Sequence, residues 1–190
     1  MNRKNITGVI LAGGNSSRMG TDKGILNLNG KKIVQYVIEA LEPVVDDIII
    51  IANNEHYSDL GFPVYKDAIK DCGPLGGIYT ALLKISNPKA IILSCDIPFV
   101  SSVFLSDIIR QSEGYDTAVP VHDGKFEPLC SVYSKNCINA FKTALDKKIF
   151  KLTDAIALVN AKKIVLPSTK EIESNFINLN SQEDLNKYKK

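Results

Sequence analysis

The hydrophobic positions of the chain alternate between solid apolar runs and helically spaced positions. Residues 6–12, 48–52 and 90–95 are largely apolar runs, which are typical of strands buried on both faces of a sheet. Residues 34–45, 75–85 and 103–111 instead show the apolar spacing of amphipathic helices, the last with Ser101 or Ser102 as its expected cap. Helices between successive strands favour parallel pairing, so the pattern predicts a mostly parallel sheet covered by helices on both faces.

The second half of the chain adds shorter elements and a turn. Asp123-Gly124 lies between two extended segments within residues 116–133, a strong hairpin signal, so we expect an antiparallel strand in the sheet. The remaining pattern predicts helices at 136–145, 152–159 and 183–188 and short strands at 63–65, 163–166 and 176–179. The expected fold class is a three-layer α/β/α, Rossmann-like fold. With 190 residues, the chain is expected to form a single domain, residues 1–190, with one main site.

The charge balance excludes some classes of partner. The 23 basic and 21 acidic residues leave a formal charge of +2, which is too small to favour a nucleic-acid or membrane partner. The apolar stretch near the N-terminus stops at Gly13, too early for a signal peptide, and no other run has the length of a membrane crossing. We therefore expect a cytoplasmic protein that binds any phosphate ligand locally.

The cysteines and histidines do not indicate a metal centre. The cysteines form no Cys-x-x-Cys pair, so we expect reduced, mostly buried thiols at Cys72, Cys95, Cys130 and Cys137. His56 and His122 have no partners at metal-ligand or catalytic spacing, and we assign them no chemistry.

Polar residues that follow the apolar runs are candidates for chemistry, because ligands of parallel sheets bind at the carboxyl ends of the strands. The first such segment, residues 11–23, reads LAGGNSSRMGTDK. Gly13 and Gly14 allow main-chain N–H groups to approach a phosphate closely. Arg18 can hold two phosphate oxygens, and Lys23 supplies a point charge. A solvated surface turn is the alternative for the glycines alone.

The same segment also excludes two common nucleotide-binding loops. It matches neither the P-loop pattern nor the dinucleotide-binding pattern, so the GTPase and dinucleotide interpretations lose their main support.

Two acids follow other predicted strands. Asp96 follows the third apolar run, and Pro98 restricts Ile97 to extended backbone, which helps to hold the carboxylate at the sheet's edge. A hard oxygen ligand there suits Mg²⁺, which binds through one or two carboxylates plus substrate phosphates, whereas an acid in an ordinary loop is the alternative. Asp67 is able to accept hydrogen bonds from ribose hydroxyls or a base edge, or is a surface acid. Residues 72–77, CGPLGG, form a turn whose small residues suit a flat base.

Together these motifs resemble the molybdenum cofactor guanylyltransferases, which share a nucleotidyltransferase fold with nucleotide-sugar pyrophosphorylases and related cytidylyltransferases. The family's opening pattern is met by residues 11–14, Ser16, residues 18–20 and Asp22-Lys23. The positions where the family places nucleotide and metal contacts are met by Asn53, Asp67, residues 73–75 with Gly77, and Cys95-Asp96 with Pro98. The family's closing motif is met by residues 178–180 and 183–185, with Gln182 where a proline is usual. The resemblance covers nearly the whole chain.

The resemblance implies an enzyme that transfers GMP from GTP to the terminal phosphate of molybdopterin, releases pyrophosphate and forms the guanine dinucleotide cofactor. Asp96 is implied to hold Mg²⁺, and Lys23, Arg18 and Asp96 are the implied catalytic residues. The implied contacts with GTP come from Leu11, Ala12, Gly13, Gly14, Lys23, Asn53, Asp67, Gly73, Pro74, Leu75 and Asp96.

The same resemblance assigns the second substrate more coarsely. Asn178 and Asn180 belong to a motif associated with the pterin side of the site. Residues 122–133, HDGKFEPLCSVY, are expected to line the pterin cleft without named contacts. Other cofactor-assembly proteins are left open as partners.

Three alternatives remain. A molybdopterin cytidylyltransferase has the same fold and reaction, but its relatives typically carry alanine in the first motif, where this chain has Gly13-Gly14. A sugar-phosphate or methylerythritol-phosphate nucleotidyltransferase normally has a proline before the motif lysine, where this chain has Asp22. A non-catalytic GTP-binding module is disfavoured by the presence of Lys23 and Asp96.

Overall fold

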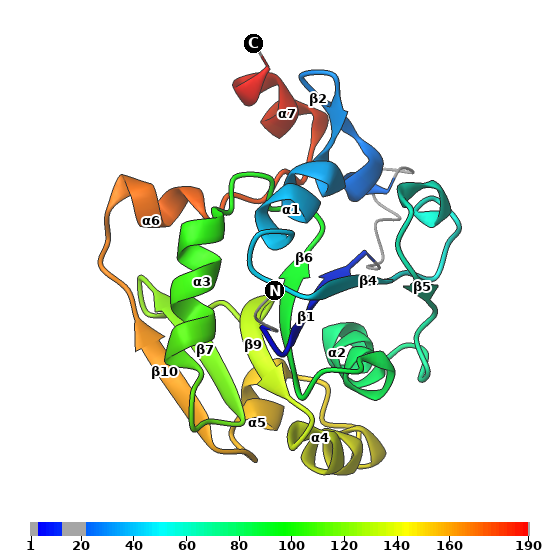
Figure 1. The fold of residues 1–190 in the computed structure, drawn as a ribbon, viewed down its shortest axis with the longest axis vertical. Helices are drawn as coiled ribbons and strands as arrows, with labels where there is room; N and C mark the ends of the chain where they lie inside the picture. The colour runs from blue at the N-terminus through cyan, green and yellow to red at the C-terminus, as the bar shows by residue number, and fades with distance from the viewer. Residues whose placement is uncertain (1–3, 13–21, 190) are drawn as a thin grey trace.

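The computed structural model describes residues 4–12 and 22–189, and within them one mixed sheet of eight strands forms the centre of the molecule (Figure 1). The strand order is β10-β7-β9-β6-β1-β4-β5, with β8 paired to β7. The strands are β1 (Ile6–Leu11), β4 (Asp47–Ile51), β5 (Val64–Tyr65), β6 (Lys89–Ser94), β7 (Thr117–His122), β8 (Lys125–Phe126), β9 (Cys130–Ser134) and β10 (Ala161–Val165).

The pairing is parallel at the centre and mixed at one side. β1 pairs in parallel with both β4 and β6, and β4 pairs in parallel with β5. β9 runs antiparallel to β6 and β7, which confirms the expected antiparallel strand. The hairpin is also confirmed, since Asp123 and Gly124 join β7 to β8 with φ angles of 48° and 74°.

Helices cover both faces of the sheet, as Figure 1 shows, so the expected three-layer α/β/α fold is confirmed. One face is covered by α1 (Ile33–Leu41) and α3 (Ser102–Gln111), and Ser101 caps α3 as expected. The other is covered by α2 (Gly73–Lys84), α4 (Cys137–Asp146) and α5 (Leu152–Ile156). Successive strand side chains point to opposite faces, so Ile48 and Ile50 join the first core while Ile49 and Ile51 join the second.

The predicted strand at residues 176–179 is wrong. A short helix, α6 (Lys170–Ser174), precedes this segment, and residues 175–180 form no strand. The apolar side chains there are used in packing: the Phe176 ring meets Phe104 edge-on and stacks on His122. The Leu179 amide donates to the Asp96 carbonyl at 2.9 Å, so its backbone partner belongs to a loop. The segment has strand-like composition without a neighbouring strand edge to pair with.

The C-terminal helix α7 (Gln182–Tyr188) packs beside Leu28 and Ile33. Beside it in Figure 1 lies the two-stranded ribbon of β2 (Asn27–Leu28) and β3 (Lys31–Lys32), which the hydrophobic pattern did not predict. A small core joins the two regions and contains Leu28, Ile33, Leu179 and Leu185.

Two further expectations concern the burial of the cysteines and the length of the helices. All four cysteines are buried and unpaired, as predicted, and burial raises the pKa of Cys95 and Cys137 to about 12. Among the helices of the described ranges, none combines the length and the apolar character that a membrane crossing requires.

Candidate active site

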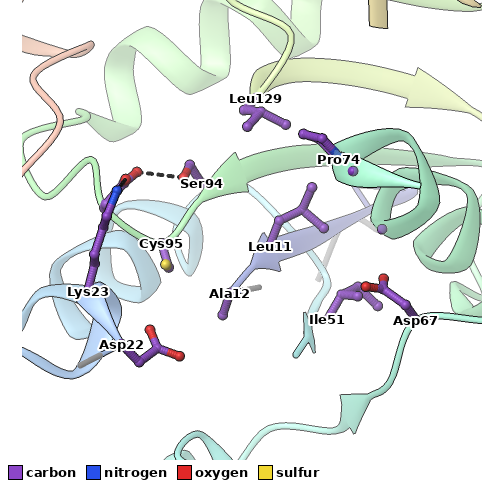
Figure 2. A pocket seen from close by; sticks show the side chains of 13 residues that line it. Leu11, Ala12, Asp22, Lys23, Ile51, Asp67, Pro74, Ser94, Cys95 and Leu129 are labelled. Atoms are coloured by element: carbon purple, nitrogen blue, oxygen red, sulfur yellow. Dashed lines mark hydrogen bonds and ion pairs between the residues drawn. The ribbon is translucent and has the colours of Figure 1, made fainter. Parts of the chain in front are cut away.

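A pocket lies where the strand order of the sheet reverses. The chain proceeds from β1 to β4 and β5 on one side and returns to β6 on the other side of β1. Such a reversal leaves a crevice at the carboxyl ends of the strands. We call the cavity there the strand-end pocket (Figure 2); it is lined by Leu11, Ala12, Asp22, Lys23, Ile51, Asp67, Gly73, Pro74, Gly77, Ser94, Cys95, Asp96 and Leu129.

A lysine and a carboxylate lie together on one side of this pocket. Lys23 begins the short 3-10 helix η2 (Lys23–Ile25), and its Nζ lies 3.7 Å from Asp96 Oδ2. Asp96 Oδ1 accepts a hydrogen bond from the Ser94 hydroxyl at 2.5 Å. The Lys23 ammonium also donates to Asn180 Oδ1 at 2.5 Å. The Lys23 side chain remains 28% exposed, so its charge is accessible from the pocket.

Asp22 is held by groups from distant parts of the chain. Its Oδ1 accepts from the Gly24 amide at 3.1 Å and from the Tyr57 hydroxyl, while its Oδ2 accepts from Asn54 Nδ2 at 2.8 Å. Tyr57 is fully buried, and burial raises its pKa far above the usual range, so its hydroxyl remains a donor. These contacts fix the backbone immediately before Lys23. Tyr57 was missed at the sequence level because nothing near it in the sequence indicates a partner 35 positions away.

A second carboxylate lies on the other side of the pocket. Asp67 and Asn53 exchange two hydrogen bonds, from Asn53 Nδ2 to Asp67 Oδ2 at 2.8 Å and from the Asp67 amide to Asn53 Oδ1 at 3.0 Å. Asp67 Oδ1 is buried and has no hydrogen-bond partner among the described residues. In Figure 2, Leu11 and Ala12 lie between Asp67 and Lys23. The pocket thus has one end with a cation and a carboxylate, and one end with a free acceptor.

Gly77 of α2 keeps the Asp67 end open. A Cβ at this position would lie 3.5 Å from Asp67 Oδ1 and 3.3 Å from a methyl group of Leu11. A side chain here would therefore occupy the space beside the free acceptor.

The strand-end pocket brings together most of the candidate residues that the structure describes. Leu11, Ala12, Lys23, Asp67, Gly73, Pro74 and Asp96 line it, and Asn53 reaches it through Asp67. Leu75 does not line the pocket, because its side chain is fully buried in the core beneath α2. Gly13, Gly14 and Arg18 lie outside the described residues.

A second cavity, which we call the side pocket, adjoins the first. It is lined by Pro74, Ser94, Asp96, Ile97, Glu127, Pro128, Leu129, Cys130, Leu152, Phe176 and Asn178. The two pockets share Pro74, Ser94, Asp96 and Leu129. Of the two asparagines in the closing motif, Asn178 lines the side pocket, whereas Asn180 contacts Lys23.

Glu127 is an acid that lines the side pocket but not the strand-end pocket. Burial raises the pKa of Glu127, and the charges of His122 and Lys125 oppose that rise. The sequence placed this residue within the segment 122–133 but did not single it out, because nothing in the local pattern distinguishes it from a surface acid.

Comparison with known proteins agrees with this architecture. Residues 8–160 match the model of the MobA-like NTP transferase domain. The chain is 36% identical to a Natranaerobius thermophilus protein named "Probable molybdenum cofactor guanylyltransferase", and the match covers 98% of this chain and 96% of the relative. It is 35% identical to the molybdenum cofactor guanylyltransferase of Yersinia pestis, over 95% of this chain and 93% of that protein.

Solved structures share the fold. The molybdopterin-guanine dinucleotide biosynthesis protein A of Archaeoglobus fulgidus superposes with a TM-score of 0.80 at 23% identity, over 96% of each chain. The 4-diphosphocytidyl-2C-methyl-D-erythritol synthase of Anaerococcus prevotii superposes with a TM-score of 0.72 at 14% identity, over 96% of this chain and 93% of the other. The fold, the strand-end pocket and the similarity over nearly the whole chain agree: the chain belongs to the MobA-like NTP transferase family, together with the molybdenum cofactor guanylyltransferases, and is a nucleotidyltransferase.

Proposed function

We propose that this nucleotidyltransferase transfers GMP from GTP to the terminal phosphate of molybdopterin and releases pyrophosphate. The observation that carries the proposal is the division of the strand-end pocket into a charged end and an acceptor end, next to a second cavity. The names of the relatives support the two substrates. A nucleotide lies in the strand-end pocket, and the pterin substrate reaches it from the side pocket.

The acceptor end favours guanine. Guanine presents two neighbouring donors, N1–H and the 2-amino group, and Asp67 Oδ1 is a buried acceptor without a partner in the described chain. Leaving such an acceptor unpaired costs about 1–3 kcal/mol, so a base that donates to it is favoured. The corresponding edge of cytosine presents one donor, its 4-amino group, beside acceptors at N3 and O2, so a carboxylate meets one donor and a neighbouring acceptor that it repels. This difference supports GTP over CTP.

The charged end suits the reacting phosphates. Lys23 donates to phosphate oxygens and offsets the negative charge that develops when a terminal phosphate oxygen of molybdopterin attacks the α-phosphorus of GTP. The new bond forms at that phosphorus as the bond to the β-phosphate oxygen breaks, and pyrophosphate leaves. Arg18 aligns the leaving group in this proposal. The chain contributes positioning and charge stabilisation without a covalent intermediate.

The residues present fit a magnesium ion. In the described ranges, no group of three or more histidine, cysteine or acidic side chains is arranged to hold a metal by itself. Mg²⁺ does not require such a group, because it binds through one or two carboxylates, substrate phosphates and water. We propose that Asp96 and the phosphates of GTP hold Mg²⁺, which would neutralise phosphate charge when bound.

A nucleotide panel tests the proposal. Purified chain is incubated with molybdopterin, MgCl₂ and each of GTP, CTP, ATP and UTP, and pyrophosphate release and the dinucleotide product are measured. We expect release with GTP only, and only when molybdopterin and Mg²⁺ are both present. Turnover with CTP but not GTP would identify a cytidylyltransferase, and GTP binding without any pyrophosphate release would identify a non-catalytic module.

A further inference from the structure

The two pockets have a similar plan. They meet at a shared wall that contains Asp96. The side pocket has one further carboxylate, Glu127, whereas the strand-end pocket has two, Asp67 and the fully hydrogen-bonded Asp22. The proposed function gives Asp67 a role in recognising guanine but gives Glu127 no role.

The backbone of Glu127 is fixed by hydrogen bonds, whereas its carboxylate forms none with the part of the chain that the structure describes. The Glu127 amide donates to the Pro120 carbonyl at 2.9 Å. Its carbonyl accepts from the Cys130 amide at 3.0 Å and from the Ser131 hydroxyl at 2.7 Å. No described residue forms a hydrogen bond or ion pair with the side-chain oxygens, although the charges of His122 and Lys125 act on them. A partly desolvated carboxylate is unfavourable without a partner, so its position favours a ligand that donates hydrogen bonds.

The rest of the side pocket suits a flat ring. Its wall includes Ile97, Leu129, Leu152 and Phe176. The Phe176 ring is held in place, since it stacks on His122 with 5.3 Å between ring centroids and meets Phe104 edge-on at 5.4 Å. A rigid, largely apolar wall with a few polar groups, here Ser94, Asp96, Glu127 and Asn178, is typical of a site for a heterocycle.

Resting on the proposed function, we infer that Glu127 recognises the pterin ring of the second substrate by accepting hydrogen bonds from its ring N–H and its 2-amino group. Pterin and guanine carry the same 2-amino-4-oxopyrimidine edge, with two adjacent donors. The chain uses one carboxylate for each ring, Asp67 for guanine and Glu127 for pterin. The phosphate of the pterin substrate then points to the shared wall, where Asp96 and Lys23 lie.

Glu127→Gln tests the inference with almost no change in size. The amide places a donor against the donors of the pterin edge, so we expect the KM for molybdopterin to rise about 10- to 100-fold, as for the loss of a charge-assisted hydrogen bond. The KM for GTP should stay within about twofold of wild type. The matched control is Asp67→Asn, which should raise the KM for GTP and leave that for molybdopterin unchanged.

A second measurement separates this inference from the proposed function. Molybdopterin is titrated into the chain without nucleotide, and binding is followed by pterin fluorescence, which needs no turnover. Weaker binding by Glu127→Gln supports the inference whichever nucleotide the panel selects. Equal binding by wild type and variant overturns it, even if GMP transfer is confirmed. Absence of molybdopterin binding by the wild-type chain overturns the inference, whereas the nucleotide panel alone decides the proposed function.

A merely structural role of Glu127 predicts a different result. In that case Glu127→Gln would weaken the binding of GTP and the binding of molybdopterin equally and would lower the unfolding temperature. That outcome also overturns the inference. Glu127→Asp provides a second variant, because it keeps the negative charge on a side chain that is one methylene shorter and so places the carboxylate farther from the ligand. We expect its affinity for molybdopterin to lie between those of wild type and Glu127→Gln.

Discussion

At the scale of single residues, the Lys23 ammonium is shared between neutral and acidic partners. It donates to Asn180 Oδ1, while the Asp96 carboxylate lies 3.7 Å away, beyond ordinary hydrogen-bond distance. A lysine engaged in this way is not committed to one tight ion pair. It can therefore redirect its charge to a phosphate with little loss.

Replacement of this lysine should affect the reaction more than binding. We expect Lys23→Ala to lower kcat about 100- to 1000-fold, as for the loss of a donor directed at developing charge, and to weaken GTP binding less than about tenfold. Steady-state kinetics and direct GTP titration measure the two effects. Lys31→Ala is the control, because Lys31 pairs with Glu39 at 2.6 Å and does not line the strand-end pocket. A loss of GTP affinity with unchanged kcat would show that Lys23 contributes only to binding, and equal losses of kcat and GTP affinity would count against Lys23 as a transition-state contact.

At the scale of elements, η2 holds Lys23 at the pocket because its first turn packs tightly. A Cβ at Gly24 would lie 2.5 Å from the Tyr57 hydroxyl oxygen and 3.1 Å from the Cys95 Sγ. This glycine is needed for space, since it is not among the residues with positive φ. Tyr57 and Gly24 therefore fit together, and Asp22 bonds to both.

This packing predicts a non-additive pair of mutations. We expect Gly24→Ala to destabilise the protein by about 1–3 kcal/mol through overpacking and to lower turnover by displacing Lys23. Tyr57→Phe alone should cost about 1 kcal/mol, because Asp22 loses one hydrogen bond. In the double variant the missing oxygen makes room for the new methyl group, so the total loss should be smaller than the sum of the single losses. Urea unfolding measures all three, and strictly additive losses would argue against this contact.

At the scale of the whole molecule, the end of the chain stabilises the site near its beginning. Leu185 of α7 is only 1% exposed and packs in the small core that includes Leu28 and Ile33. The Asn180 amide donates to Asp184 Oδ2 at 3.1 Å, so α7 also holds the residue that contacts Lys23. The terminal helix therefore helps to position the charged end of the pocket, through Asp184, Asn180 and Lys23.

Loosening α7 should therefore affect catalysis from a distance. We expect Leu185→Ala to lower the free energy of unfolding by about 2–5 kcal/mol, as for other buried leucines, and to reduce kcat at temperatures where the variant remains folded. Leu158→Ala is the control, because Leu158 is 52% exposed and should change neither quantity appreciably. A stability loss with unchanged kcat would show that α7 supports the fold but not the site.

Local pattern was sufficient for most elements of the sheet and its helices. Residues of β1, β4 and β6 form nearly continuous apolar runs because both faces of these strands are buried, and burial of that kind is visible in sequence. Asp123-Gly124 predicted its hairpin because few other residues adopt left-handed backbone at two successive positions. The rule that ligands bind at the carboxyl ends of parallel strands then directed attention to residues 11–23 and Asp96, and Lys23 and Asp96 do line one pocket.

The same patterns failed where a residue's partner is remote. Residues 176–179 have the composition of a strand, but no strand edge is available to them. Phe176 packs against α3 and β7, and Leu179 joins the small core with Leu28 and Leu185. Leu75 belongs to a glycine-proline motif at the pocket, yet helical geometry turns its side chain into the core. Composition alone does not reveal either outcome.

The sequence by itself determined which segments are buried, where the chain turns and which polar residues follow the central strands, because these properties depend on neighbours within a few positions. Only the tertiary structure decided that Tyr57 binds Asp22, that Asn180 binds Lys23, and that Glu127 lies in a pocket beside Asp96. Each of these contacts joins residues far apart in sequence. Their energy depends on distance and burial in the folded chain, which no local pattern contains.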